Sequence, residues 1–172
     1  MTDLHSVLVD KHAWNGRTNN RGVAIIKYCE GWPKGGKPYV CPAGYWTTGY
    51  GNLRGLNGKR VNKSSPTLTK AQGEELLRRD LAMTEKAVHA LVGPRLSANQ
   101  FSATVSLVFN IGSGNFKASQ IRSRLLRDDH DGAADIWRQW RRGGPSRRIL
   151  PGLVKRREME KELFLSEPTT TS

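Results

Sequence analysis

The segment from residue 97 to residue 111 constrains the fold of this chain more than any other part of it. Ser97 is followed three residues later by Gln100, a pair that is typical of the first turn of a helix. Apolar side chains lie almost all round the helix that this pair opens: Phe101, Val105, Val108 and Phe109. A helix of this kind is usually buried by other helices. We therefore expect a helical bundle with this segment at its centre, ending at Gly112 and Gly114.

A second capping pair, Thr69 with Gln72, predicts a helix that ends before Gly93-Pro94. Its apolar residues recur along one face: Leu77, Leu81, Val88 and Leu91. Its outer side carries pairs of opposite charge four residues apart, Glu74 with Arg78 and Glu75 with Arg79. This helix should pack its apolar face against the bundle.

Weaker signals predict four more helices. The first begins with Asn20 as its N-cap and ends near Glu30, because Gly31 and Pro33 both stop helices. Its apolar side is formed by Val23, Ile25 and Ile26. The others are expected at about residues 117–127, at about 131–141, and from Pro151, which suits a first turn, to about Leu165.

Residues 34–62 differ in character from the rest of the chain. Glycine recurs through them, and β-favouring runs stand at residues 38–41 and 45–50. Pro42-Ala43-Gly44, between the two runs, is a turn signal. We expect a small antiparallel β-hairpin or a three-stranded sheet here.

The fold class that follows is α+β, with a small antiparallel hairpin or sheet packed beside a mainly helical bundle. The length of 172 residues suits one domain. We place this domain at residues 19–166, after a polar lead-in at residues 1–18 and before a disordered tail at residues 167–172.

The net charge is unusual, since 28 Lys and Arg face 15 Asp and Glu, which gives +13. A surface this basic attracts nucleic acids, anionic lipids and the anionic polymers of a bacterial envelope, and the charge alone does not choose among them. Residues 117–161 hold 13 basic and 6 acidic residues. They form either a solvated basic face or a surface for the anionic cell wall or outer membrane. Membrane contact would use Arg122, Arg124, Arg127, Arg138, Arg141 and Arg142, with Trp137 and Trp140.

We expect both tryptophans to belong to the core rather than to form surfaces on which a sugar stacks.

No apolar run approaches the roughly 18 residues of a membrane span, and Asp10 and Lys11 interrupt the short apolar run near the start. We expect a protein that accumulates in the cytoplasm, and a substrate outside the inner membrane would require something else to let the protein out.

The cysteines and histidines predict neither a metal site nor a cofactor. Cys29 and Cys41 match no zinc spacing, and they are expected as two free thiols, with a redox pair as the alternative. The four histidines, at positions 5, 12, 89 and 130, show no metal-ligand spacing either.

Glu30 is the candidate for acid catalysis. It stands at a helix end, beside Trp32 and directly before the glycine-rich region. A carboxyl group held against apolar or aromatic surface tends to stay protonated, and a protonated carboxyl can act as a general acid. An isolated glutamate at a helix end is more often simply solvated, so the case for a catalytic Glu30 depends on the motifs that follow it.

Those motifs resemble the phage-type lysozymes of glycoside hydrolase family 24. The resemblance starts with Glu30-Gly31, with Cys41 and Thr47 separated by five residues, and with Gly49-Tyr50-Gly51-Asn52. It continues in the family's order through Leu68-Thr69, Gln100-Phe101, Phe109-Asn110-Ile111-Gly112, Phe116 with Ser119, Trp137, and Pro151-Gly152-Leu153 with Arg156-Arg157. The ordered series covers about residues 20–165 and implies a lysozyme-like fold, with a cleft between the hairpin and the helices.

The resemblance also implies a function and a site. The activity would be that of an endolysin, a muramidase that cuts the bond between N-acetylmuramic acid and N-acetylglucosamine in peptidoglycan, by inversion. Glu30 would protonate the leaving oxygen, and Cys41 and Thr47 would hold or activate a water on the opposite face of the sugar. Substrate would also contact Tyr50, Gly51, Leu53, Phe109 and Ser119. Neither a metal nor a cofactor is implied, and a monomer is expected.

Three features depart from the family pattern. Cys41 stands at the position where the family has Asp or, in some relatives, Cys, and a neutral thiol stabilises a positively charged transition state less well than a carboxylate does. The spacing from Glu30 to Cys41 is longer, and Asn52 stands where many relatives have His. The role of Cys41, as thiol, thiolate or water-positioning group, stays open.

Two other functions are weighed against this one. A lytic transglycosylase needs one acid/base and no partner that positions water, so Cys41 and Thr47 argue against it. A basic module that binds nucleic acid would explain the charge, but no nucleic-acid motif is visible, and we expect no nucleic-acid partner.

Overall fold

The computed structural model describes residues 14–41 and 44–167. The expected lead-in lies outside the described residues up to position 13, and so do the turn residues 42–43 and the tail from position 168. The described helices are α1 (Asn20–Glu30), α2 (Lys70–Val92), α3 (Ala98–Ile111), α4 (Ser113–Lys117), α5 (Gln120–Leu125), α6 (His130–Ile136) and α7 (Pro151–Leu165), with short 3-10 turns at Lys34–Gly36 and Trp137–Gln139.

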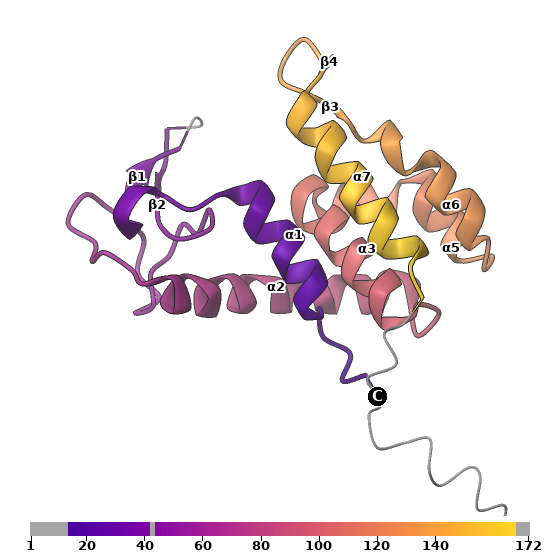
Figure 1. Cartoon of the computed structure of the whole chain (residues 1–172), viewed down its shortest axis with the longest axis horizontal. Helices are drawn as coiled ribbons and strands as arrows, with labels where there is room; N and C mark the ends of the chain where they lie inside the picture. Colours follow the sequence, from indigo (N-terminus) through magenta and orange to yellow (C-terminus); the bar gives the residue numbers. More distant parts are fainter. Residues whose placement is uncertain (1–13, 42–43, 168–172) are drawn as a thin grey trace, which may run out of the picture.

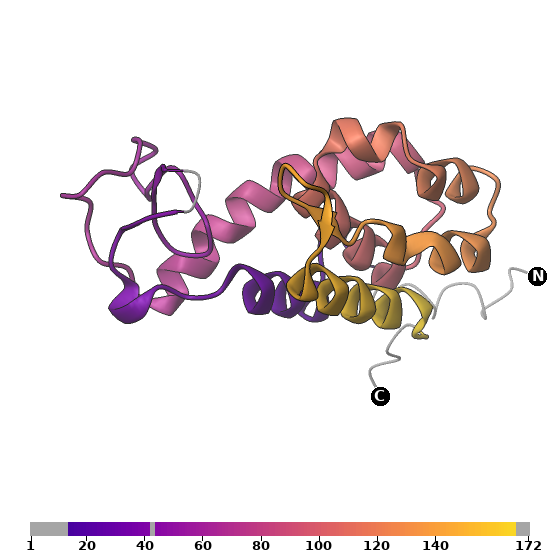
Figure 2. The ribbon, with the colours of Figure 1, turned by 90° about the horizontal axis from the view of Figure 1, so that it is seen from above.

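Two lobes lie at opposite ends of α2 (Figures 1 and 2). One is the small lobe of β1 (Tyr39–Val40), β2 (Trp46–Thr47) and the loops that follow them; the other is the helical bundle of α3 to α7. The long helix α2 runs from the first lobe into the second, and α1 lies between them. This arrangement confirms the α+β class expected from the sequence.

The centre of the bundle is α3, as its apolar sequence predicts. It packs against α1, α2 and α7, and its buried residues lie on every side of the helix. Ser97 and Gln100 form the expected capping box, and the N–H of Gly112 closes the helix on the carbonyl of Val108. The predicted centre of the fold is confirmed.

The predictions for α2 are also confirmed. Thr69 and Gln72 form the capping box, Gly93 caps the end, and Leu77, Leu81 and Val88 are buried. The two predicted charge pairs form, with distances of 3.2 Å for Glu74–Arg78 and 2.5 Å for Glu75–Arg79. One continuous helix, α2, therefore connects the small lobe to the bundle.

Helix α1 brings its last residue, Glu30, to the junction of the lobes. Its N-cap is Asn19, one residue before the expected Asn20; the Asn19 side chain accepts the N–H of Gly22. A Cβ added to Gly22 would lie 2.7 Å from the Cβ of Ser102, so this glycine lets α1 approach α3 closely. The helix ends at Gly31, whose φ of 74° favours glycine.

The small lobe contains the predicted hairpin in its two-stranded form. Strands β1 and β2 are antiparallel, with Tyr39 opposite Thr47 and Val40 opposite Trp46. Beyond β2 the chain makes isolated bridges between Thr48 and Asn52 and between Arg54 and Arg60, so it folds back on itself without forming a third strand in the part that the structure describes.

The helices after α3 differ from the prediction in their bounds. The chain restarts a helix directly after Gly112, so Gly114 lies inside α4 instead of ending α3. The segment expected at 117–127 is the shorter α5, because Ser119 caps it. The segment expected at 131–141 is α6 followed by a 3-10 turn, with Asp129 as the cap.

A second hairpin, between the 3-10 turn and α7, was not predicted. It pairs β3 (Arg142–Gly143) with β4 (Arg148–Ile149). Its turn includes Gly144 and Arg147, both with positive φ. Nothing was predicted from the sequence for the residues between the two expected helices, although Gly143-Gly144-Pro145 is a pattern typical of turns.

Trp137 belongs to the core. Its side chain is fully buried, and its ring packs on Phe164 with the centroids 4.9 Å apart. Trp140 is partly buried against the same core. The prediction of core tryptophans is therefore confirmed, and the suggestion that Trp137 contacts a membrane is wrong, because its ring does not reach the surface.

Candidate active site

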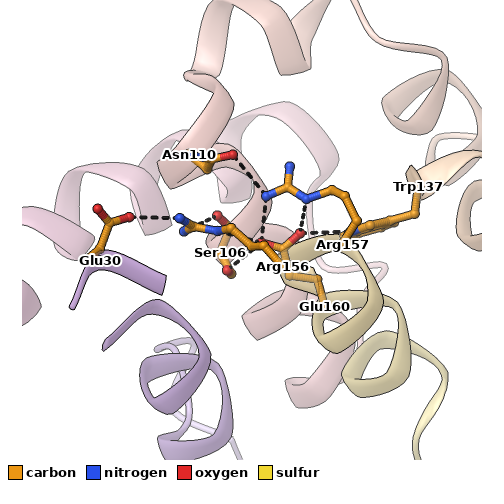
Figure 3. Close-up of polar contacts among 7 residues, drawn as sticks. All are labelled: Glu30, Ser106, Asn110, Trp137, Arg156, Arg157 and Glu160. Atoms are coloured by element: carbon orange, nitrogen blue, oxygen red, sulfur yellow. Dashed lines mark hydrogen bonds and ion pairs between the residues drawn. The ribbon is translucent and has the colours of Figure 1, made fainter. Parts of the chain in front are cut away.

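The Glu30 side chain lies at the junction of the two lobes, about one quarter exposed (26%). Its Oε1 accepts a hydrogen bond from Nη1 of Arg156 at 2.8 Å, and the two groups form an ion pair (Figure 3). The neighbour of this carboxyl group is therefore a guanidinium instead of the aromatic surface expected from the sequence. Trp32 packs on Tyr50 instead, with ring centroids 5.0 Å apart.

The second oxygen of Glu30 faces the small lobe. A Cβ added to Gly51 would lie 3.5 Å from Glu30 Oε2, so the turn after β2 passes close to this atom. The hydrogen bond from Arg156 reaches Oε1 and not Oε2. Arg156 of α7 thus holds Oε1, whereas Oε2 faces the lobe that carries the hairpin.

Cys41 and Thr47 share a face of the hairpin. The register places Tyr39 opposite Thr47, and alternation along the strand puts Cys41 on the side of Tyr39. The pKa of Tyr39 is raised, first by burial and then by electrostatic interactions with Cys41 and Glu30, so Tyr39 lies within electrostatic reach of both groups. The structure therefore brings this hairpin face and Glu30 to the same region.

Thr47 is buried, with only 2% of it exposed. Its hydroxyl donates to the carbonyl oxygen of Tyr45 at 2.9 Å, which leaves the lone pairs of Oγ1 as acceptors. The backbone N–H of Cys41 also donates to the Tyr45 carbonyl, at 2.9 Å. These backbone contacts fix both side chains on a rigid strand pair.

The residues predicted to contact substrate lie in different settings. Tyr50 is buried beneath Trp32, and Gly51 passes Glu30. Leu53 is about half exposed, and Phe109 is partly buried against the core.

Ser119 is buried, and its hydroxyl donates to the Phe116 carbonyl while accepting the N–H of Arg122, so it caps α5. The contacts of Leu53, Phe109 and Ser119 with a sugar stay predictions.

A cavity of about 520 Å³ opens beside Glu30 on the α7 side. It is lined by Tyr28, Cys29 and Glu30 of α1, Asn110 of α3, and Leu150, Gly152, Leu153, Lys155 and Arg156 at the start of α7. Cys29 and Cys41 are not joined in a disulfide, and burial raises the pKa of Cys29. Sequence reasoning noticed Arg156 only as part of a motif and assigned it no role.

Arg156 is nearly fully buried, with 4% of its side chain exposed. Burial opposes its charge, but the nearby carboxylates Glu160 and Glu30 outweigh this effect, so the pKa of Arg156 is raised. The guanidinium therefore stays charged and holds Glu30 in place. Among the described residues no group of three or more His, Cys, Asp or Glu could hold a metal ion.

Comparison with known proteins gives relatives over most of the chain. A family model described as phage lysozyme matches residues 27–160. The endolysin of Acyrthosiphon pisum secondary endosymbiont phage 1 is 37% identical over 150 residues, which cover 86% of this chain and 97% of that protein. The endolysin of Salmonella phage P22 is 34% identical and covers the same shares of the two chains.

Solved structures agree with the sequence relatives. The endolysin from Escherichia coli O157:H7 phage FAHEc1 matches with a TM-score of 0.78 and 28% identity, over 87% of this chain and 93% of that one. A mutant of P22 lysozyme matches with a TM-score of 0.78 and 33% identity, over 87% and 99% of the two chains. The motifs, the two-lobed fold and these matches agree: the chain belongs to the phage lysozyme family.

Proposed function

We propose that this protein is an endolysin, a muramidase that hydrolyses the β-1,4 bond between N-acetylmuramic acid and N-acetylglucosamine in bacterial peptidoglycan. The observation that carries the proposal is the placement of Glu30 at the junction of the lobes, with Oε1 held by Arg156 and Oε2 left toward Gly51. Membership of the phage lysozyme family and the endolysin relatives support the substrate class.

In the proposed reaction, Glu30 gives its proton to the glycosidic oxygen while the bond from that oxygen to the anomeric carbon breaks. A water attacks the anomeric carbon from the opposite face, loses a proton to solvent, and leaves a sugar of inverted configuration. Glu30 then takes a proton from solvent. Inverting glycosidases hold their two catalytic groups about 6.5–9.5 Å apart so that a water fits between them.

Cys41 and Thr47 are the groups that we propose for this water. The Oγ1 lone pairs of Thr47 are oriented by its bond to the Tyr45 carbonyl and can accept a hydrogen bond from the water. The Cys41 side chain shares the face of the hairpin with Thr47. Neither side chain needs to bond covalently to the sugar.

The ion pair with Arg156 orients Glu30, and a general acid must carry a proton when it acts. A sugar bound in the cleft displaces water from the carboxyl group, which disfavours its charged form. We propose that substrate binding itself promotes the protonation of Glu30.

The direct test compares Glu30→Gln, Cys41→Ser and Thr47→Ala in a turbidity assay on purified peptidoglycan. We expect Glu30→Gln to lose at least about a hundredfold in rate, as expected for removal of a general acid, and the other two to show smaller, graded losses. Glu158→Gln, an exposed change of the same kind on α7, serves as the control. Clearing at the wild-type rate by Glu30→Gln would contradict the proposal.

The products distinguish hydrolysis from transglycosylation. Mass spectrometry should find reducing muramic ends, and NMR of the first products should find the α anomer, as inversion of a β bond requires. Products with 1,6-anhydro ends would instead identify a lytic transglycosylase.

The charge of the surface suits an anionic substrate. We propose that the net charge of +13 attracts the protein, as a monomer, to the cell wall and to the anionic outer-membrane surface. The exposed arginines of the bundle lobe would make this contact without Trp137. Analytical ultracentrifugation and binding to anionic vesicles test the two parts of this proposal separately.

The described residues include no helix with the length and apolar character of a membrane span. We propose that the protein waits in the host cytoplasm until a separate pore-forming protein opens the inner membrane. The test is expression in a susceptible host: lysis should follow only when the inner membrane is permeabilised with chloroform. Lysis without permeabilisation would contradict this route.

A further inference from the structure

A carboxylate behind the site is fully buried and fully paired. Glu160 of α7 is 0% exposed. Its Oε1 accepts from the hydroxyl of Ser106 at 2.6 Å and from Nε of Arg156 at 3.1 Å. Its Oε2 pairs with Nε of Arg157 at 2.9 Å and accepts from the indole N–H of Trp137 at 3.1 Å (Figure 3). The four partners come from α3, the 3-10 turn and α7, so Glu160 joins three elements of the bundle.

The charges of this cluster do not balance without Glu30. Arg156 and Arg157 are both buried, and Glu160 neutralises only one of the two. Burying an unpaired charge is costly, so the remaining positive charge needs a carboxylate. That carboxylate is Glu30, which the cluster reaches through Nη1 of Arg156.

The direction of that contact depends on Glu160. Arg156 donates Nε to Glu160, Nη2 to the Ser106 carbonyl at 3.2 Å, and Nη1 to Glu30. A guanidinium is planar with its donors in fixed directions, so fixing Nε and Nη2 also fixes Nη1. The buried carboxylate therefore sets the position from which Arg156 holds the acid.

We propose that Glu160 is a positioning residue for the reaction: it aims Arg156 at Glu30 and shares the charge of Arg156, so that Glu30 is oriented without being locked as a carboxylate. This inference rests on the proposed role of Glu30 as the acid. Glu160 touches neither substrate nor solvent, and it acts only through Arg156.

Several titratable groups surround Glu30, and they bear on any pH effect. They are Tyr28 and Cys29 of α1, Tyr39 and Cys41 of the hairpin, and Lys155 and Arg156 of α7. Arg156 is the charged group bonded to Glu30, and it is the one that Glu160 contacts. Arg156 is therefore the hydrogen-bonded path from Glu160 to Glu30, while Cys29 also interacts electrostatically with both carboxylates.

The test is Glu160→Gln, measured as kcat and KM on soluble peptidoglycan fragments between about pH 4 and pH 9, the range that spans the ordinary carboxyl and histidine pKa values. Without Glu160, the undivided charge of Arg156 favours the carboxylate form of Glu30. The acid then loses its proton at lower pH, so the alkaline limb of the kcat profile should move down by about one pH unit. KM should change by less than about twofold, because no substrate contact is removed.

The matched control is Glu162→Gln. Glu162 is exposed and lies two residues further along α7, and its substitution removes the same charge from the chain. Its profile should coincide with that of the wild type. A shift of equal size in both variants would assign the effect to the overall charge and overturn the proposal.

Two further variants keep the test decisive if Glu160→Gln does not fold. Ser106→Ala removes one donor to Glu160 and keeps both the charges and the bond from Arg156 to Glu160, so it should move the limb by less than Glu160→Gln does. Arg157→Gln combined with Glu160→Gln keeps the net charge of the cluster but still deprives Arg156 of its partner, so the shift should persist.

An alkaline limb that stays in place in every folded variant, with rates that fall only as the folded fraction falls, would overturn the positioning role. Glu30→Gln is measured in parallel to separate the two hypotheses. If Glu30→Gln is inactive and the limb does not move, only the role of Glu160 fails. If Glu30→Gln is active, the proposed function fails first.

Discussion

Gly51 illustrates how a single residue shapes the site. Its φ is 91°, in the region that side chains other than glycine rarely adopt, and a Cβ added to it would lie 3.5 Å from Oε2 of Glu30. The absence of a side chain therefore permits the turn and also leaves space beside the oxygen that we propose as the proton donor.

We predict that Gly51→Ala lowers the rate of peptidoglycan clearing by at least about tenfold, since small misplacements near reacting groups are costly. The backbone strain should also lower the free energy of unfolding by about 1 kcal/mol. Gly58→Ala is the control, because Gly58 has a φ of 74° and an added Cβ meets nothing within 4 Å. Equal activity in the two variants, measured by turbidity beside thermal unfolding, would show that Gly51 matters only for the turn.

At the scale of elements, an ion pair joins α2 to α1, the helix that ends at Glu30. Lys27, in the last turn of α1, pairs with Glu74 of α2 at 2.7 Å. The hydrogen bond from Lys27 is the main cause that holds the pKa of Glu74 below its ordinary value of 4.5. The same bond raises the pKa of Lys27. Both groups are about one third exposed, so water weakens the pair.

We predict that Glu74→Gln lowers the free energy of unfolding at neutral pH by no more than about 1 kcal/mol. A carboxyl group with a lowered pKa stabilises the fold above its unfolded value of 4.5, and this contribution is lost as the pH falls through the folded value. Urea unfolding should therefore separate the variant from the wild type at neutral pH and not at strongly acidic pH.

Glu75→Gln provides the comparison for this element. Glu75 pairs only with Arg79 of the same exposed helix face, so its loss should leave the contact of α1 with α2 intact. A difference between Glu74→Gln and wild type that persists unchanged in strong acid would show that the ion pair is not its cause.

The whole molecule is strongly basic, and the charge is unevenly placed. Residues 136–157 contain Lys and Arg but neither Asp nor Glu. Among them, Arg142, Arg147 and Arg148 are exposed on the β3–β4 hairpin, which projects from the bundle lobe in Figure 1. Exposed charges act over a Debye length of about 8 Å at physiological salt, so this surface should speed encounter with anionic polymers chiefly at low salt.

We predict that the rate of clearing falls as salt is raised and that Arg147→Gln with Arg148→Gln weakens this dependence. The matched pair, Lys63→Gln with Lys86→Gln, removes two exposed charges elsewhere. Initial rates at low substrate, measured over a series of NaCl concentrations, check the prediction. If the initial rate depended equally on salt concentration in the two double variants, only the net charge would matter and the hairpin would have no special role.

The sequence by itself determined the features whose partners lie within a few residues. The capping boxes at Thr69 and Ser97 form as predicted, and Pro151 opens the last helix, because a cap needs only the first turn beside it. Likewise, α3 is apolar on almost every side, so it must be buried whichever elements pack against it. Glu30, Cys41 and Thr47 were recognised as one site only through the resemblance to a family.

Tertiary structure alone decided the surroundings of the acid. Arg156 is 126 positions from Glu30, and Glu160 is 54 positions from Ser106, so neither contact leaves a periodic or local trace in the chain. The bounds of α4 and the β3–β4 hairpin were also missed. Local hydrogen bonding can be predicted from adjacent residues, whereas the pairing of buried charges is settled only when distant helices meet.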